Sequence, residues 1–112
     1  MVVSDRIKDV VISGGENVYP AEVEAAIAAT GLVSDVAVVG REHPTWGEVP
    51  VAFIVAAPNA GPVDSERLSA LLSSRLARYK HPHLVIALDE LPRNAMGKVM
   101  KHELRARLAT LA

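Results

Sequence analysis

Apolar residues in the first half of the chain fall into short runs that are separated by turn-forming residues. This pattern predicts strands over residues 7–13, 16–19, 33–40 and 49–56. The first two runs are separated only by Gly14-Gly15, which is typical of a β-hairpin with a tight glycine turn. Pro50 has no N–H to donate to a ladder, so we expect it at the beginning of its strand or on an edge.

Three further stretches have the spacing of helices. The first begins at Pro20, which suits the first helical position, and ends at Gly31. The second is capped by Asp64 or Ser65, ends near residues 78–80, and has an apolar face made by Leu68, Leu71, Leu72 and Leu76. The last helix has an apolar face made by Met100, Leu104, Leu108 and Leu111.

The remaining segments complete the expected order of elements. A loop over residues 41–47, which holds His43, Pro44 and Trp46, separates the two central strands, and a further strand covers residues 84–88. The order is hairpin, helix, strand, strand, helix, strand, turn, helix. It predicts an α+β fold, with an N-terminal β-hairpin plus a small three-stranded sheet, mixed or antiparallel, packed with helices. We expect a single domain over residues 1–112.

Composition excludes several classes of function. The chain has 112 residues, of which 50% are apolar, and it carries a formal net charge of −1, so nothing favours binding to nucleic acid. It has no cysteine, which excludes disulfides and thiolate chemistry. Charges early in the chain exclude a signal peptide of the usual form, and no later run is long enough to span a bilayer. We therefore expect a cytoplasmic protein without a membrane span.

The segment over residues 91–101 carries the most informative candidate chemistry. Pro92 restricts the backbone and Gly97 frees it, so Lys98 is expected at the tip of a shaped turn. A lysine there is a flexible point charge that can enter another surface. A Gly-Lys pair by itself is more often a solvated loop lysine, so this reading needs a second motif.

Familiar nucleotide and metal sites do not fit the sequence. A Walker loop needs glycine five positions before Gly97 and serine or threonine after the lysine, where this chain has Pro92 and Val99. Gly14-Gly15 lacks the spacing of a dinucleotide fingerprint. His81-Pro82-His83 has no further ligand at metal-binding spacing, so we expect no metal site. No Ser-His-Asp arrangement suggests itself.

A combination of motifs carries a family resemblance. The stretch from Asp5 to Glu24 reads Asp-Arg-Ile-Lys-Asp-Val-Val-Ile-Ser-Gly-Gly-Glu-Asn-Val-Tyr-Pro-Ala-Glu-Val-Glu. It closely resembles the C-terminal-domain signature of the acyl-adenylate-forming (AMP-binding) enzymes, most of all the acyl-CoA synthetases of the fatty-acid–CoA ligase branch. Later segments are similar to later motifs of that family, in the same order: Trp46-Gly47-Glu48, Tyr79-Lys80-His81-Pro82 and Leu91 to Lys98.

The resemblance implies a two-step acid–thiol ligase. In such enzymes a carboxylic acid attacks ATP, with Mg²⁺, to give an acyl-adenylate, and the thiol of coenzyme A then displaces AMP. The ATP and acid pockets belong to a large N-terminal adenylating domain, which is absent here and is the expected partner in cis or in trans. The C-terminal domain is a mobile lid. This segment alone is expected neither to turn over nor to hold a bound cofactor.

The resemblance also assigns roles to particular residues. Lys98 matches the catalytic lysine of adenylation, Arg6 the residue that binds the ribose of the nucleotide, and Lys8 the hinge within residues 1–8. Residues that match the coenzyme A channel are Gly14, Gly15, Glu16, Trp46, Tyr79 and Lys80. Some relatives place arginine or lysine at positions 81 and 83, where the phosphates of the coenzyme lie. This chain has histidines there, which are largely neutral at pH 7.

Two other readings of the sequence stay open. One is a non-catalytic α+β interaction module that keeps the fold without the chemistry. The other is a self-contained binder of a small ligand. The acid substrate is not readable from this segment, because its pocket belongs to the absent domain.

Overall fold

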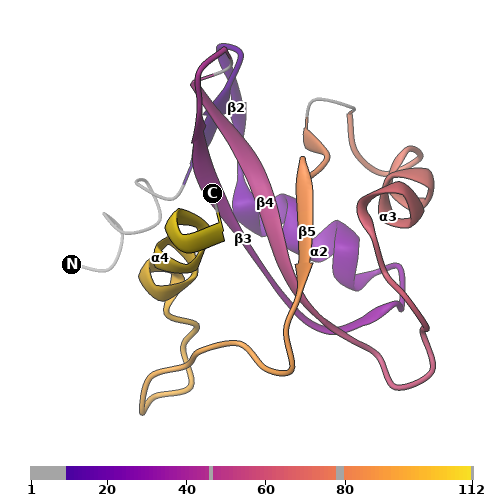
Figure 1. Cartoon of the computed structure of the whole chain (residues 1–112). Coiled ribbons are helices and arrows are strands. Elements are labelled where there is room, and N and C mark those ends of the chain that lie inside the picture. The colour runs from indigo at the N-terminus through magenta and orange to yellow at the C-terminus, as the bar shows by residue number, and fades with distance from the viewer. Residues whose placement is uncertain (1–9, 46, 78–79, 112) are drawn as a thin grey trace.

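A computed structural model describes residues 10–45, 47–77 and 80–111. The elements follow the chain as labelled in Figure 1. They are β1 (Val11–Ser13), β2 (Glu16–Val18), α2 (Pro20–Ala28), β3 (Val33–His43), β4 (Gly47–Ala56), α3 (Ser65–Leu72), β5 (Leu84–Ala87) and α4 (Lys101–Leu111).

Strand β4 is the centre of a mixed five-stranded sheet. Strand β3 pairs with it antiparallel along one edge, from Val33 opposite Ala56 to His43 opposite Gly47. The other edge is shared: β1 pairs antiparallel with the beginning of β4, and β5 pairs parallel with its middle. Strand β2 pairs with β1, so the N-terminal hairpin is joined to the main sheet.

Alternation along the two central strands produces two cores. Side chains that point to one face pack with α2 and α3 in a cluster that includes Val38, Ala52, Ile54, Ile27 and Leu68. Their neighbours point to the opposite face and pack with α4 in a cluster that includes Ala37, Val39, Phe53, Leu104 and Leu108. Figure 1 shows α4 on one side of the sheet and α2 on the other. The sheet is therefore buried on both faces, which explains the near-continuous apolar runs.

The expected α+β class is confirmed, with an N-terminal hairpin, a sheet and helices packed against it. The expected loop over residues 41–47 is wrong in extent. Backbone pairing continues through Arg41 opposite Val49 and Glu42 opposite Glu48, so polar side chains here belong to paired strands. Ladder bonds use only the backbone, and polar side chains therefore do not end a strand.

Pro50 lies inside β4 and is not at its beginning. Its carbonyl accepts the backbone N–H of His83 at 2.8 Å, on the edge that β1 and β5 share. On this edge β1 pairs at Gly47 and β5 pairs from Val51 onward. Pro50 therefore lies in the gap between the two partners, where the ladder needs no N–H.

The second helix is shorter than expected. Of the two predicted caps it is Asp64 that caps the helix, because its carboxylate accepts the backbone N–H of Arg67 at 2.8 Å. The helix ends at Leu72, however, and not near residues 78–80. The hydroxyl of Ser73 donates to the carbonyl of Ala70 at 3.0 Å, which is a local bond that competes with helix continuation.

Candidate functional site

Residues 93–99 form a small β-hairpin, which we call the lysine hairpin. Arg93 and Val99 pair as an antiparallel bridge at its base. The N–H of Gly97 donates to the carbonyl of Asn94 at 2.9 Å, and the N–H of Asn94 donates to the carbonyl of Lys98 at 2.9 Å. Gly97 has φ of 83°, the left-handed conformation that closes a three-residue hairpin loop. The glycine predicted from sequence is thus required by the turn.

The side chain of Asn94 fixes the inside of the lysine hairpin. Its oxygen accepts the backbone N–H of Met96 at 2.9 Å and that of Lys98 at 3.0 Å. The Lys98 side chain is exposed, and no ion pair with it occurs among the described residues. Its backbone is therefore held on both sides while its ammonium faces solvent.

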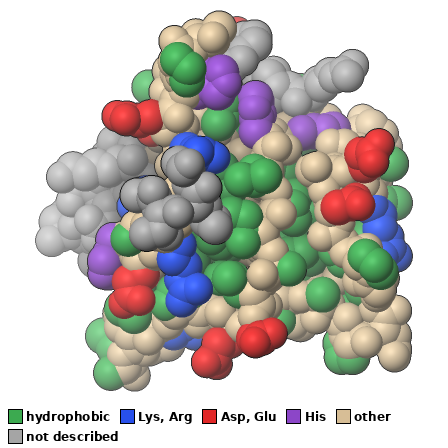
Figure 2. All heavy atoms as spheres, viewed as in Figure 1, with side chains coloured by type: hydrophobic (Ala, Val, Ile, Leu, Met, Phe, Trp, Pro, Cys, Tyr) green, Lys and Arg blue, Asp and Glu red, His purple; other side chains and the backbone are tan. Residues whose placement is uncertain are grey.

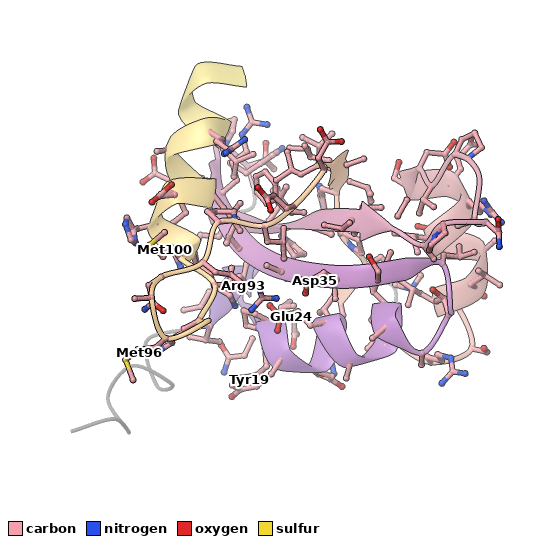
Figure 3. The ribbon with its side chains drawn as sticks, turned by 90° about the horizontal axis from the view of Figure 1, so that it is seen from below. Tyr19, Glu24, Asp35, Arg93, Met96 and Met100 are labelled. Carbon is pink, nitrogen blue, oxygen red and sulfur yellow. The ribbon has the colours of Figure 1, made fainter. Side chains whose placement is uncertain are left out.

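One detail of the sequence prediction is wrong. Lys98 does not occupy the tip of the turn, because Ala95 and Met96 do, and Met96 is 91% exposed. Lys98 begins the arm that returns to the domain. Figure 3 shows Met96 at the outer end of this loop and Met100 at the start of α4.

The base of the lysine hairpin is anchored to the domain at two places. Leu91 is buried in the core that α4 covers, and the N–H of Met100 donates to the carbonyl of Pro92 at 2.9 Å. On the other side, the guanidinium of Arg93 pairs with the carboxylate of Asp35 on β3. Figure 3 shows these last two side chains pointing toward one another.

The β1–β2 turn forms a second shaped loop, which we call the glycine hairpin (residues 13–16). Gly14 and Gly15 both have positive φ, 60° and 84°, as a two-residue type I′ turn requires. A Cβ at Gly15 would meet no atom within 4 Å, so its outer side is open. The carboxylate of Glu48 on β4 accepts the N–H of Ile12 at 3.1 Å and thereby links β1, the strand before this turn, to β4.

The two hairpins lie far apart. In Figure 1 the glycine hairpin is at the upper end of the molecule, and the orange loop that contains Lys98 is at the lower end. The domain measures 37 × 35 × 28 Å along its principal axes. Among the described residues, the Gly14-Gly15-Glu16 turn and Lys98 therefore lie at opposite ends of the domain.

A cavity of about 320 Å³ lies beside the end of β3. It is lined by Arg41, Glu42, His43, Pro44, Val49, Val51, His83 and Leu84. The ring centroids of His43 and His83 are 6.2 Å apart in an edge-to-face arrangement. Burial lowers the pKa of His83, and the charge of His43 lowers it further. Figure 2 shows histidine side chains gathered at the upper end of this face.

The structure separates the two histidines that sequence had grouped. The ring of His81 lies 3.3 Å from the carbonyl of Leu76 and lines a different cavity, of about 350 Å³, beside α3. The sequence does not predict that His43 lies near His83, because the two residues are 40 positions apart and share no motif. Pairing of β3 and β5 with β4 brings them together.

The other predicted site residues are placed as follows. Lys80 forms an ion pair with Glu22 of α2 at 3.0 Å, so its charge is already partnered within the domain. Glu16 is exposed beside the glycine turn. Arg6, Lys8, Trp46 and Tyr79 lie outside the described residues.

Within the described part of the chain, no group of three or more His, Cys, Asp or Glu side chains is arranged to hold a metal ion. The helices described there are all too short or too polar to cross a membrane.

Residues 22–98 match the model of the AMP-binding enzyme C-terminal domain. The chain belongs to that family. This AMP-binding enzyme C-terminal domain is 50% identical over 104 residues to the 2-succinylbenzoate–CoA ligase of Bacillus velezensis, which covers 93% of this chain and 21% of the ligase. The resemblance predicted from the motifs is therefore confirmed.

Solved structures agree with this assignment. The fatty acyl CoA synthetase of Mycobacterium tuberculosis aligns with a TM-score of 0.86 and 44% identity, covering 95% of this chain and 21% of that one. The o-succinylbenzoate CoA synthetase of Bacillus subtilis, in complex with its acyl-adenylate intermediate, aligns with a TM-score of 0.78 and 42% identity, covering 87% and 19%. The AMP-binding enzyme C-terminal domain thus spans about a fifth of the relatives it matches.

Proposed function

We propose that this domain is the mobile C-terminal lid of an acyl-CoA synthetase. The full enzyme activates a carboxylic acid with ATP to an acyl-adenylate and then transfers the acyl group to coenzyme A. The domain supplies Lys98 to the first step and the loop of Gly14, Gly15 and Glu16 to the second. The acid, ATP and Mg²⁺ are held by a large N-terminal adenylating domain, in cis or in trans.

The observation that carries this proposal is the separation of the two hairpins. They lie at opposite ends of the sheet, in a domain that is 37 Å long. One fixed orientation brings only one of them to an active site held by another domain. A lid that rotates between the half-reactions presents each hairpin in turn, which is a rigid-body transition of a known kind.

The geometry of the lysine hairpin suits a donated charge. Negative charge concentrates on the α-phosphate and the attacking carboxylate in the first transition state. A preorganised cation placed there stabilises that charge more than it stabilises the ground state. Lys98 meets this need because its backbone is fixed by Asn94 and its ammonium is exposed.

The glycine hairpin suits the second step. Positive φ at Gly14 and Gly15 fixes a tight turn without side chains, and the outer side of Gly15 is open. The thin pantetheine arm of coenzyme A fits against such exposed backbone. The cavity lined by Arg41, His43 and His83 offers one guanidinium and the N–H groups of two imidazoles as hydrogen-bond donors for its phosphates. Arg6, Lys8, Trp46 and Tyr79 keep the roles predicted from the motifs.

The decisive experiment measures the two half-reactions separately in this chain combined with its N-terminal adenylating domain. Lys98→Ala is expected to slow adenylation, followed as pyrophosphate release, by about 10²–10³-fold. Formation of the thioester from supplied acyl-adenylate and coenzyme A should stay unchanged.

A matched control is Arg107→Ala, which removes a cation from the exposed side of α4 and should leave both steps unaffected. Equal losses in both half-reactions of Lys98→Ala would contradict the proposed role, and so would full retention of adenylation.

A further inference from the structure

We propose that Arg93 is a positioning residue for adenylation, which sets the direction of the lysine hairpin through its ion pair with Asp35. This inference rests on the proposed role of Lys98 and adds a residue through which that lysine is aimed. It follows from how the hairpin is connected to the sheet.

The lysine hairpin is stiff within itself. Four hydrogen bonds link Asn94 to Met96, Gly97 and Lys98 through backbone and side-chain atoms. A unit of this kind moves as one body, so the position of Lys98 depends on the contacts at its base. One side of that base is held by the buried side chain of Leu91 and by the hydrogen bond from the N–H of Met100 to the carbonyl of Pro92.

Arg93 holds the other side. One guanidinium nitrogen donates to the carbonyl of Gly97 at 2.6 Å, which belongs to the peptide that precedes Lys98. A second nitrogen donates to the carboxylate of Asp35 on β3. A single planar group therefore links the peptide before the lysine to a strand of the central sheet (Figure 3).

Asp35 is itself fixed. It follows the register shift at the beginning of β3, and its other carboxylate oxygen accepts the N–H of Val36 at 3.0 Å. From that position β3 pairs regularly with β4 as far as His43. The ion pair thus links the hairpin to a strand that pairs with β4 along its length.

The solvent exposure of the Arg93–Asp35 ion pair limits how much it can contribute to the stability of the fold. The side chains of Arg93 and Asp35 are 41% and 31% exposed, and ion pairs this open to water contribute little to folding. Catalysis is far more sensitive to position, because a misplacement of about 1 Å costs about 10²-fold in rate. We therefore expect losing the pair to change the rate of one step and to leave thermal stability nearly unchanged.

The test uses the chain combined with its adenylating domain. Arg93→Ala is expected to lower kcat of adenylation by about 10²-fold, with KM for ATP nearly unchanged and the thioester step unaffected. Asp35→Asn should give a smaller loss in the same step. Once Arg93 is absent, adding Asp35→Asn should cause no further loss, because the two residues act as one unit.

Lys101→Ala is the matched control. It breaks an ion pair with Glu24 at 3.0 Å that is also partly exposed but lies outside the lysine hairpin. Thermal midpoints of all variants should agree within about 4 °C. Additive effects of the Arg93 and Asp35 substitutions, or equal losses in both half-reactions, would overturn the inference.

Lys98→Ala, measured in parallel, distinguishes a failure of the proposed function from a failure of the positioning role of Arg93. If Lys98→Ala leaves adenylation intact, the proposed function fails and the inference fails with it. If Lys98→Ala abolishes adenylation while Arg93→Ala does not slow it, only the positioning role of Arg93 is overturned.

Discussion

Asn94 and Lys98 hold one another through two hydrogen bonds across the lysine hairpin. The side-chain oxygen of Asn94 accepts the N–H of Lys98 at 3.0 Å, and the N–H of Asn94 donates to the carbonyl of Lys98 at 2.9 Å. The main chain of the lysine is thus fixed by a residue of the same turn, while its side chain extends into solvent. Preorganisation of this kind comes from hydrogen bonds within the turn itself and needs no contact with another domain.

Replacing Asn94 tests this relationship. Asn94→Ala removes the acceptor for Met96 and Lys98, so we expect adenylation to slow by about tenfold to 10²-fold because the lysine is less well placed. Asn94→Asp keeps the acceptor and should retain most of the rate. Pyrophosphate release measures both. Equal rates for Asn94→Ala and the parent protein would contradict the expected effect.

Gly97 tests the turn itself. Its φ of 83° is strained for other residues, although a Cβ there would meet no atom within 4 Å. Gly97→Ala should therefore lower the free energy of unfolding by about 1–2 kcal/mol through backbone strain alone, and slow adenylation. Gly97→Asn should do less harm, since asparagine tolerates this conformation. Denaturant titration and the adenylation assay measure the two effects.

Gly15 offers the corresponding test of the second step. Gly15→Ala should slow thioester formation and leave adenylation unchanged, because its side chain would project where the pantetheine arm is proposed to lie. Gly31→Ala is a matched control, with φ of 77° against 84° and equally open surroundings, but at the end of α2. A similar loss of thioester formation in both variants would show that strain, and not the site, is responsible.

The lowered pKa of His83 should make the stability of the domain depend on pH. This pKa is lowered in the folded state, by burial and by His43, in a cavity that Arg41 and Glu42 also line. The unfolded chain therefore binds a proton at His83 more readily than the folded chain does. The folded state is most favoured above about pH 6.5, where His83 is neutral in both states, and the free energy of unfolding decreases on acidification below that pH. Between about pH 7.5 and about pH 5.5, His83→Gln should lose less stability than the parent protein in thermal unfolding. An identical decrease in both proteins would contradict this assignment.

Much of the fold was predictable because its causes are local. Short apolar runs placed the central strands, glycines at 14 and 15 marked the hairpin, and the Asp64-Ser65 pair marked the start of α3. Helix spacing likewise identified Leu104 and Leu108 as core residues. Each of these features follows from backbone conformation and from the periodicity of side chains within a short window.

The ends of the strands and helices were less predictable, because they depend on hydrogen bonds that compete with the local sequence pattern. Polar residues 41–43 were assigned to a loop, yet they pair with β4 through backbone atoms alone. Leucine residues continue at helical spacing as far as Leu76, yet α3 ends at Leu72. The next residue, Ser73, donates its hydroxyl to the carbonyl of Ala70. Leu76 is still buried, through the turn that follows.

The sequence by itself determined the family, the apolar runs that form the central strands, and the lysine and glycine turns. Only the tertiary structure decided how those turns are supported and where they point. Arg93 pairs with Asp35, 58 residues away in the sequence, and His83, just before β5, meets His43 at the end of β3. The physical reason is that turn geometry is fixed within a few residues, whereas ion pairs and cavities arise between side chains that only the packing of the sheet brings together.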